Sequence, residues 1–355
     1  MRLPVFLRST VFRLLAAMLL AAAVPAATLA ADDAVDHDDR QAGLDLLRQA
    51  GDAWRSGNFR GRFFYVRGNR MDSMQVVHAV FDGVEHERLS HLDNTTTEII
   101  RRGDETICIH PDSRLTRLDA AGAAGPFRAF AALEKGAGRF YIVRRSGQSR
   151  VAGRSAEFVE IWPRDFYRYG YRLWIDSQSR LPLRYEVVNR KGAALESVEF
   201  ADIETGIEVP RDLFALPSGP RNTLTLMRST EAPMPTVSPS WLPPGFRVTG
   251  SQTQRLAKAG DSPEAIRQSS SVTYSDGLAS FSLFVEQADV DARPMGRQIG
   301  PTVAVSGVLN AGNAGRFRVT LVGEVPAGAA VKVVESTRYR ADPPPDPEAT
   351  AVSAP

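Results

Sequence analysis

The stretch Gln75–Ser90 has the sequence QVVHAVFDGVEHERLS and reads as two strands joined by a two-residue turn. Asp82 and Gly83 form the turn, because this pair readily adopts the backbone that a tight antiparallel hairpin requires. Gln75–Phe81 and Val84–Ser90 are the two predicted strands. The stretch therefore predicts an antiparallel hairpin, and similar hairpins on both sides of it decide the fold class.

The pattern from Phe59 to Phe200 is mostly strand, with turn residues between successive strands. A second hairpin is predicted where Gly103-Asp104 separates Thr96–Arg102 from Glu105–His110. Further strands are expected at Arg62–Arg67, Phe140–Arg145, Glu157–Trp162, Tyr169–Asp176, Leu183–Asn189 and Leu195–Asp202.

Two helices are predicted beside these strands. Apolar residues along one face, including Leu47 and Trp54, predict a helix from Arg40 to Arg55 that ends at Ser56-Gly57-Asn58. A segment rich in alanine and glycine predicts a second helix, or a lid, near Pro126–Lys135. We therefore expect the α+β class, with a curved antiparallel sheet (a half-barrel) that covers helices.

Length and proline content predict two domains. A chain of 355 residues exceeds the usual size of one domain. Prolines accumulate after residue 227 among serine, threonine and glutamate, and they stiffen a linker there. The expected parts are a first domain at residues 40–218, a linker at 219–240, a second domain at 241–340 and a tail at 341–355.

The second domain is expected to be smaller and mainly antiparallel. Ser275-Asp276-Gly277 supplies one hairpin turn, and Asn310–Gly315 supplies another. Pro326 begins a short helix, Ala327–Ser336, that is expected to pack on the sheet. Residues 341–355 hold five prolines and no aromatic side chain, which predicts a disordered tail.

Residues 1–30 have the order of segments found in a secretory signal peptide. Three arginines precede an uncharged apolar run, Leu14–Val24, which is shorter than the about 20 residues needed to cross a membrane. Small residues at Thr28 and Ala30 predict cleavage after Ala30. The mature protein is therefore expected to be exported, and a retained N-terminal anchor is the alternative.

Composition argues against nucleic-acid binding and excludes an intramolecular disulfide. Removing residues 1–30 takes away three arginines and no acids, so 40 basic residues remain against 41 acidic ones and the net charge is about −1. Such a chain has no overall positive field with which to bind nucleic acid. Its single cysteine, Cys108, cannot form an intramolecular disulfide and is expected to pack as a small apolar residue.

The sequence contains no motif of a catalytic or metal site. The five histidines form no pair with metal-ligand spacing, and one cysteine cannot make a Cys-x-x-Cys motif. The nucleophile elbow of hydrolases, the P-loop and the dinucleotide-binding glycine motif are also absent. We therefore expect a binding protein without a cofactor, a metal or catalytic residues, and an exported hydrolase is the least favoured alternative.

The segment Phe158–Trp174 has the most unusual local composition in the chain, because aromatic residues and arginines alternate in it. In a curved sheet, alternate side chains can line an apolar cup, and placed cations can bind a polar head group. An amphiphile is the ligand that this composition favours, and an ordinary sheet core with solvated arginines is the alternative. The candidate amphiphile-binding residues are Phe158, Trp162, Arg164, Phe166, Arg168, Tyr169, Tyr171, Arg172 and Trp174.

Several segments resemble a known family. Trp174-Ile175-Asp176 and Arg180–Arg184 resemble the strand–turn–strand signature of lipoprotein-carrier-like folds. Trp241–Phe246, with the sequence WLPPGF, resembles the opening of the second domain of the MucB/RseB family of periplasmic sigma-E regulators. Tyr274–Ser282 and Gly323–Pro326 also resemble segments of that family.

The resemblance implies a periplasmic negative regulator of the envelope stress response. Such a regulator would bind the periplasmic segment of a membrane-bound anti-sigma-E factor and shield it from regulated proteolysis, and lipid or lipopolysaccharide would release it. A periplasmic lipid or lipoprotein carrier is the alternative, and self-association as a homo-oligomer stays open. The second domain would supply much of the partner contact, through the candidate residues Trp241, Phe246, Tyr274 and Phe281.

Overall fold

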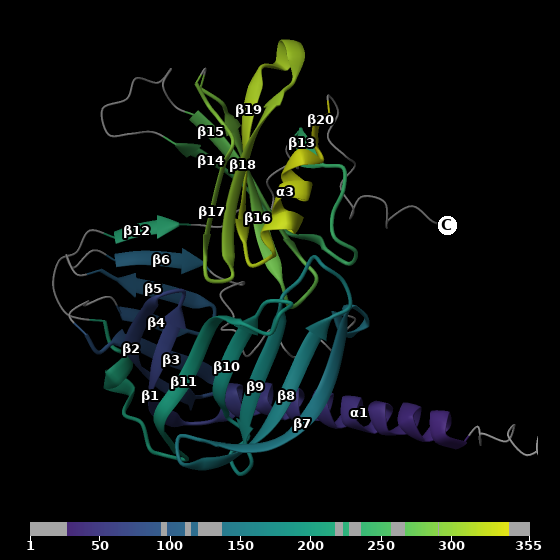
Figure 1. Ribbon diagram of the computed structural model, residues 1–355. Coiled ribbons are helices and arrows are strands. Elements are labelled where there is room, and N and C mark those ends of the chain that lie inside the picture. The colour runs from purple at the N-terminus through teal and green to yellow at the C-terminus, as the bar shows by residue number, and fades with distance from the viewer. Residues whose placement is uncertain are drawn as a thin grey trace, which may run out of the picture.

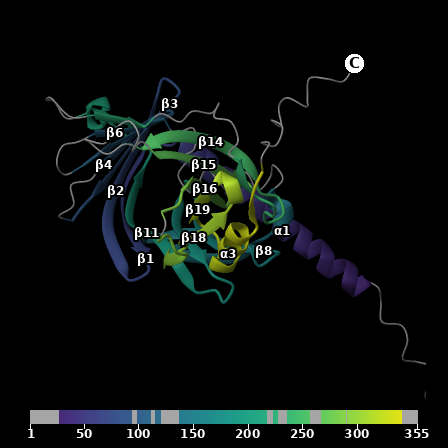
Figure 2. The same ribbon diagram turned by 90° about the horizontal axis from the view of Figure 1, so that it is seen from above.

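The computed structural model describes residues 27–93, 98–110, 115–119, 137–216, 223–226, 236–256, 267–289 and 291–340. In these residues a 12-stranded sheet and a 6-stranded sheet form the centres of two domains. The smaller sheet lies over one end of the larger one, and helix α1 (Ala27–Ser56) crosses behind the larger sheet (Figure 1). Seen from above, the strands of the larger sheet follow a curve (Figure 2).

The larger sheet is antiparallel except at one edge. Its strand order is β12-β6-β5-β4-β3-β2-β1-β11-β10-β9-β8-β7, and only β12 (Thr223–Leu226) pairs in parallel, with β6 (Leu115–Asp119). The other strands are β1 (Phe59–Arg67), β2 (Arg70–Phe81), β3 (Val84–His91), β4 (Glu98–Arg102), β5 (Glu105–Ile109), β7 (Tyr141–Val151), β8 (Arg154–Pro163), β9 (Gly170–Asp176), β10 (Pro182–Val188) and β11 (Ala194–Thr205).

Both hairpins that turn residues predicted are present. Phe81 pairs with Val84 across Asp82-Gly83, and the φ angles of the two turn residues are 52° and 77°. Arg102 pairs with Glu105 across Gly103-Asp104. The turn chemistry therefore places β2 beside β3 and β4 beside β5, as the sequence predicted.

The core of the first domain lies between α1 and the inner face of the curved sheet. Leu47, Ala50 and Trp54 on α1 are buried in the same cluster as Val143 on β7 and Leu173 on β9. Burying one large apolar side chain contributes about 1.5–3 kcal/mol, so this cluster holds the helix on the sheet.

Helix α1 is longer than predicted, because it begins at Ala27 instead of Arg40. Residues 27–39 contain four alanines and neither glycine nor proline, so helix propensity outweighs the acidic residues there. Among the described residues, no helix combines the length and apolar character needed to cross a membrane. The helix or lid predicted near Pro126–Lys135 lies outside the described residues.

The second domain is a sheet with the strand order β14-β15-β16-β19-β18-β17, and α3 (Ala327–Glu335) packs on it. This helix confirms the one predicted at Ala327–Ser336. The predicted class, a curved antiparallel sheet covering a helix and followed by a smaller mainly antiparallel domain, is confirmed. The strands of the second domain are β14 (Arg247–Leu256), β15 (Arg267–Ser275), β16 (Ser280–Gln287), β17 (Met295–Ile299), β18 (Thr302–Asn310) and β19 (Arg316–Gly323). Short 3₁₀ helices are η2 (Ala137–Phe140), η3 (Arg211–Phe214) and η5 (Gly312–Ala314).

The segment interpreted as a linker, residues 219–240, contains two strands. β12 extends the sheet of the first domain, whereas β13 (Val237–Pro239) pairs with β20 (Thr337–Tyr339) in the second domain. These strands have only 4 and 3 residues, and their partners lie far away in the sequence. A periodicity argument therefore misses them, although they anchor the two ends of the segment to different domains.

Candidate functional site

The junction between the two domains is built around one buried cation, Arg168. It lies in the loop between β8 and β9, and its side chain is completely buried. Its Nε donates to the Oδ2 of Asp276 at 2.5 Å, and its two terminal nitrogens donate to Asp165 and to the backbone oxygen of Pro244. Asp276 and Pro244 belong to the second domain, so this guanidinium joins the two domains.

The carboxylate of Asp276 has a complete set of partners. Its Oδ1 accepts hydrogen bonds from the backbone N–H groups of Leu278 and Ala279, which closes the turn between β15 and β16. Its Oδ2 accepts from Arg168 and also from the hydroxyl of Tyr141, at 3.2 Å. Burial, followed by nearby charges, raises the pKa of Tyr141 well above its ordinary value, so this hydroxyl stays protonated and donates a hydrogen bond to Asp276. A buried ion pair is tolerated only with such additional hydrogen bonds.

Aromatic rings from both domains enclose the guanidinium of Arg168. Its carbon Cζ lies 4.6 Å from the ring centre of Phe140 in the first domain and 5.0 Å from that of Phe246 in the second. Gly245 comes so close that a Cβ there would lie 2.0 Å from Phe140. The segment Trp241–Phe246 is therefore a docking segment that places its own backbone and ring against the first domain.

A second cluster of rings and a lysine lies at the solvent-exposed side of this junction. Tyr167 and Trp241 meet edge to face with ring centres 5.0 Å apart. The Nζ of Lys332, on α3, lies 4.0 Å from the ring centre of Trp241 and 3.3 Å from the hydroxyl of Tyr167. Cation–π contacts of this kind are worth about 0.5–1 kcal/mol at exposed sites, so they support the junction only modestly.

The domains also meet beside the turn between β17 and β18. Gln298 donates to the hydroxyl of Tyr169 at 3.3 Å, and a Cβ on Gly300 would lie 2.5 Å from Cγ of Arg67. The hydroxyl of Tyr65 donates to Glu196 at 2.9 Å in the same region. Burial raises the pKa of Glu196 above its ordinary value, and that of Tyr169 to about 12.

The predicted amphiphile-binding residues do not share one face of the sheet. Phe158, Trp162, Arg172 and Trp174 are half-buried on the outer face, because Val159, Ile161, Tyr171 and Leu173 between them point to the core. Tyr169, Tyr171 and Arg168 are buried, and Arg164 and Phe166 are exposed. The segment therefore divides between outer face, core and domain junction.

The outer-face residues form an ordered patch of rings and charges. Phe158 and Trp174 stack with ring centres 4.7 Å apart, and Arg184 lies 4.6 Å from the ring centre of Trp174. Arg172 pairs with Glu160 at 3.3 Å and lies 5.7 Å from the ring centre of Trp162. The guanidinium groups already have carboxylate partners, so an anionic head group would compete with them.

The predicted partner-binding residues lie mostly in the core of the second domain. Phe246, Tyr274 and Phe281 are buried. The rings of Phe246 and Tyr274 each stack on the ring of Phe281, with ring centres 5.3 Å apart. A buried ring presents no surface to a partner, so these three residues hold the domain together in this structure. Trp241 lies at the junction, as Phe246 does, but it is half-buried and is the member of the set that is partly accessible there.

The described residues contain one grouping with the spacing of metal ligands. One ligand atom each of Asp72, His91 and Asp93 lie within 4.8 Å of one another. Arg70 already pairs with Asp72, and acidic groups near a surface often gather in this way without a metal. We assign no metal to this grouping.

Arg168, Trp241 and Phe246 are candidates from the sequence that lie at the junction, although the sequence assigns them to ligand or partner binding. Asp276 and Tyr141 are junction residues that are not among the candidates. Asp276 was interpreted only as part of a turn, although it also pairs with Arg168, which is 108 positions away. Tyr141 was interpreted only as part of a strand. The segments Trp241–Phe246 and Tyr274–Ser282 did point to this place, because each contributes to the contact around Arg168.

Two family models match the chain, each over one domain. The MucB/RseB N-terminal domain matches residues 42–217, and the MucB/RseB C-terminal domain matches residues 233–338.

Curated relatives match over most of their own length. The sigma factor AlgU regulatory protein MucB of Pseudomonas aeruginosa is 36% identical over 303 residues, covering 84% of this chain and 91% of the relative. The sigma-E factor regulatory protein RseB of Escherichia coli K12 is 26% identical over 298 residues, covering 83% of this chain and 90% of the relative.

Solved structures match over both domains. A crystal structure of MucB in complex with MucA(peri) gives a TM-score of 0.68 at 33% identity, covering 84% of this chain and 100% of that one. A crystal structure of MucB gives a TM-score of 0.58 at 31% identity, covering 84% and 98%.

Proposed function

The chain belongs to the MucB/RseB family, and we propose that it is a periplasmic regulator that binds the periplasmic segment of a membrane-bound anti-sigma-E factor. The family consists of regulatory binding proteins, and the expectation that this chain is not an enzyme is confirmed on that ground. Residues 1–30 support the periplasmic location, because their pattern is that of a secretory signal peptide.

One observation carries the proposal. The chain matches a MucB solved in complex with MucA(peri) over both domains, in the same order, and over the whole length of that MucB chain. The buried contact between Arg168 and Asp276 supports it further, because it joins the domains into one body that can present a continuous surface to a partner.

The regulatory consequence is part of the same proposal. The bound regulator shields the anti-sigma factor from regulated proteolysis and so restrains the envelope stress response. Lipid or lipopolysaccharide binds the regulator and releases its partner. The half-buried rings of Phe158, Trp162 and Trp174 support apolar contact with an amphiphile, and its anionic head group would replace carboxylates that now pair with Arg172 and Arg184.

The free energy from burying an acyl chain is similar in size to the binding free energy of a peptide partner. Burying ten methylene groups of an acyl chain contributes about 8 kcal/mol before ordering costs. A complex with a micromolar dissociation constant has a binding free energy of about 8 kcal/mol. One acyl chain can therefore displace a peptide, provided that it prefers the peptide-free form of the regulator.

A binding measurement tests the proposal. A fluorescent synthetic peptide with the sequence of the periplasmic segment of the anti-sigma factor from the same organism is titrated with the full chain, and a scrambled peptide serves as the control. We expect saturable binding of the first peptide only. Lipopolysaccharide added to the complex should release the peptide and restore its cleavage by a protease. Equal binding of both peptides would refute the proposed function.

A further inference from the structure

Strand β18 of the second domain extends beyond its neighbour at the edge of the sheet. β17 pairs with residues 302–306 of β18, from Ile299 opposite Thr302 to Met295 opposite Ser306. On its other side, β18 continues to pair with β19 as far as Asn310. Residues 307–310 of β18 therefore have a strand neighbour on one side only. Pro294 precedes β17 and has no backbone N–H, so β17 cannot extend the ladder to cover this edge.

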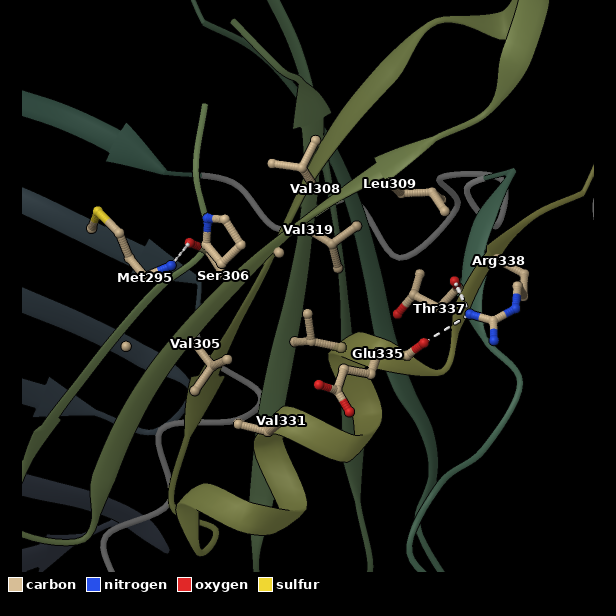
Figure 3. A pocket seen from close by; sticks show the side chains of 14 residues that line it. Met295, Val305, Ser306, Val308, Leu309, Val319, Val331, Glu335, Thr337 and Arg338 are labelled. Atoms are coloured by element: carbon tan, nitrogen blue, oxygen red, sulfur yellow. Dashed lines mark hydrogen bonds between the residues drawn. The ribbon is translucent and has the colours of Figure 1, made fainter. Parts of the chain in front are cut away.

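An apolar pocket lies directly beside this open edge. It has a volume of about 620 Å³ and is lined by residues of β17, β18, β19, α3 and β20, and its apolar side chains include Leu309, Val319, Val331 and Val334 (Figure 3). Val331 is 38% exposed, and Met295 at the rim is 73% exposed. Gly307 keeps α3 close to the strand, because a Cβ there would lie 2.8 Å from Val334. The volume is in the range of pockets that bind ligands.

We propose that this edge and pocket bind an extended segment of the anti-sigma factor's periplasmic region by strand addition. The inference rests on the proposed function and names the surface that this function uses. Alternate residues of 307–310 direct their N–H and C=O groups away from β19, and the main chain of another peptide satisfies these groups. An alkyl chain fills an apolar pocket but satisfies none of these groups, so the combination of edge and pocket selects a peptide over a lipid.

The geometry specifies the segment. Four residues of β18 span about 13 Å, so a segment of four or five residues covers the open edge. Side chains alternate between the faces of a sheet, so every second residue of the segment faces α3. We therefore expect an apolar residue at these alternate positions, with its side chain between Leu309 and Val331.

A matched pair of variants tests the pocket. Val331→Glu places a charge in the pocket, whereas Val248→Glu places the same charge on β14, at the opposite edge of the same sheet. The two valines are 38% and 39% exposed, so both variants are expected to fold, which thermal melts check. We expect the peptide from the anti-sigma factor to bind at least tenfold more weakly to Val331→Glu and normally to Val248→Glu.

Hydrogen exchange tests the edge in the unaltered chain and does not depend on any variant. Bound peptide should slow exchange of those amides among residues 307–310 that face away from β19, and it should leave exchange in β14 unchanged. Peptide that binds wild type and Val331→Glu equally, without protection of 307–310, would overturn this site and leave the proposed function intact. Failure of the wild type to bind any peptide would overturn the proposed function itself.

Two other occupants of the edge give different results. If deletion of residues 341–355 speeds exchange at 307–310 without any peptide, the chain's own C-terminal segment covers the edge. If protection of 307–310 rises with protein concentration alone, a second copy of the chain covers it. Either result would overturn the assignment of this edge to the anti-sigma factor.

Discussion

The Nε of Arg168 lies 2.5 Å from the Oδ2 of Asp276, and both side chains are completely inaccessible to solvent. The two residues come from different domains, and each has further hydrogen-bond partners. Removing Arg168 would therefore leave the carboxylate of Asp276 buried without a counter-charge, whereas Arg168 also pairs with Asp165 in its own loop.

Replacing Arg168 should weaken the junction strongly. Arg168→Met leaves the carboxylate of Asp276 buried without its cation, and breaking a buried pair in this way costs about 3–5 kcal/mol. Urea unfolding measures the loss. Arg164→Met is the matched control, because Arg164 lies four positions earlier in the same loop and is exposed. It should change stability by less than about 0.5 kcal/mol, and equal losses in both variants would contradict the junction's role.

Gly245 should tolerate no side chain. It has a φ angle of 86°, and a Cβ there would lie 2.0 Å from the ring of Phe140. Gly245→Ala is expected to cost more than about 1 kcal/mol, because it combines backbone strain with a clash across the junction. Gly250→Ala is the control, since its Cβ would meet no atom within 4 Å. Thermal melts of both variants check this, and unchanged melting of Gly245→Ala would show that the segment shifts freely.

Acidification should destabilise the first domain through His78. The ring is completely buried and stacks on Phe59 at 4.9 Å, and its Nδ1 lies 2.7 Å from the backbone oxygen of Gly57. Burial lowers the pKa of His78 below its ordinary value of 6.5. The unfolded chain then binds a proton more readily than the folded one, so stability present above pH 6.5 is lost as the pH falls towards the lowered pKa.

Urea unfolding at pH 7.5, 6.5 and 5.5 measures this dependence. The His78→Gln variant has no titrating group at this position and serves as the control. Its stability should fall less than that of the wild type over the same interval. Parallel profiles for the two proteins would assign the pH dependence to other groups.

Trp174 should contribute less stability than a core tryptophan. It is half-buried, with Phe158 stacked on one side and Arg184 close to its ring. A ring pair contributes about 0.5–1.5 kcal/mol beyond its buried area and an exposed cation–π contact about 0.5–1 kcal/mol. Trp174→Ala is therefore expected to cost about 1–3 kcal/mol, compared with about 3–5 kcal/mol for a fully buried ring.

A double-mutant cycle isolates the contact with Phe158. Trp174→Ala and Phe158→Ala are measured singly and together by urea unfolding. The coupling free energy should be about 0.5–1.5 kcal/mol. If instead the variants were additive while amphiphile binding fell, the ring would serve the ligand and not the fold.

Local chemistry accounts for what could be predicted from the sequence. The pairs Asp82-Gly83 and Gly103-Asp104 adopt tight turns on their own, so the hairpins around them follow from a few neighbouring residues. The helix after Pro326 follows for the same reason. β17 was not predicted, because all five of its residues are exposed and it has no apolar alternation.

Pairings over long distances account for what could not be predicted. Whether Phe158 and Trp174 face the core or the outside depends on how the loop between β8 and β9 sets their register, and composition does not reveal this. The partnership of Arg168 with Asp276 likewise depends on how two domains dock. The aromatic composition of this segment was visible, but its division between core, outer face and junction was not.

The short strands β12 and β13 anchor the two ends of the interdomain segment, so this segment tethers the two domains to each other. Only ten residues separate the end of β12, Leu226, from the start of β13, Val237, so the two halves can move apart by at most roughly 40 Å after their contact breaks. Rejoining is then an intramolecular encounter at an effective concentration on the order of millimolar. If the contact around Arg168 opens, this tether therefore favours its re-formation within the same molecule.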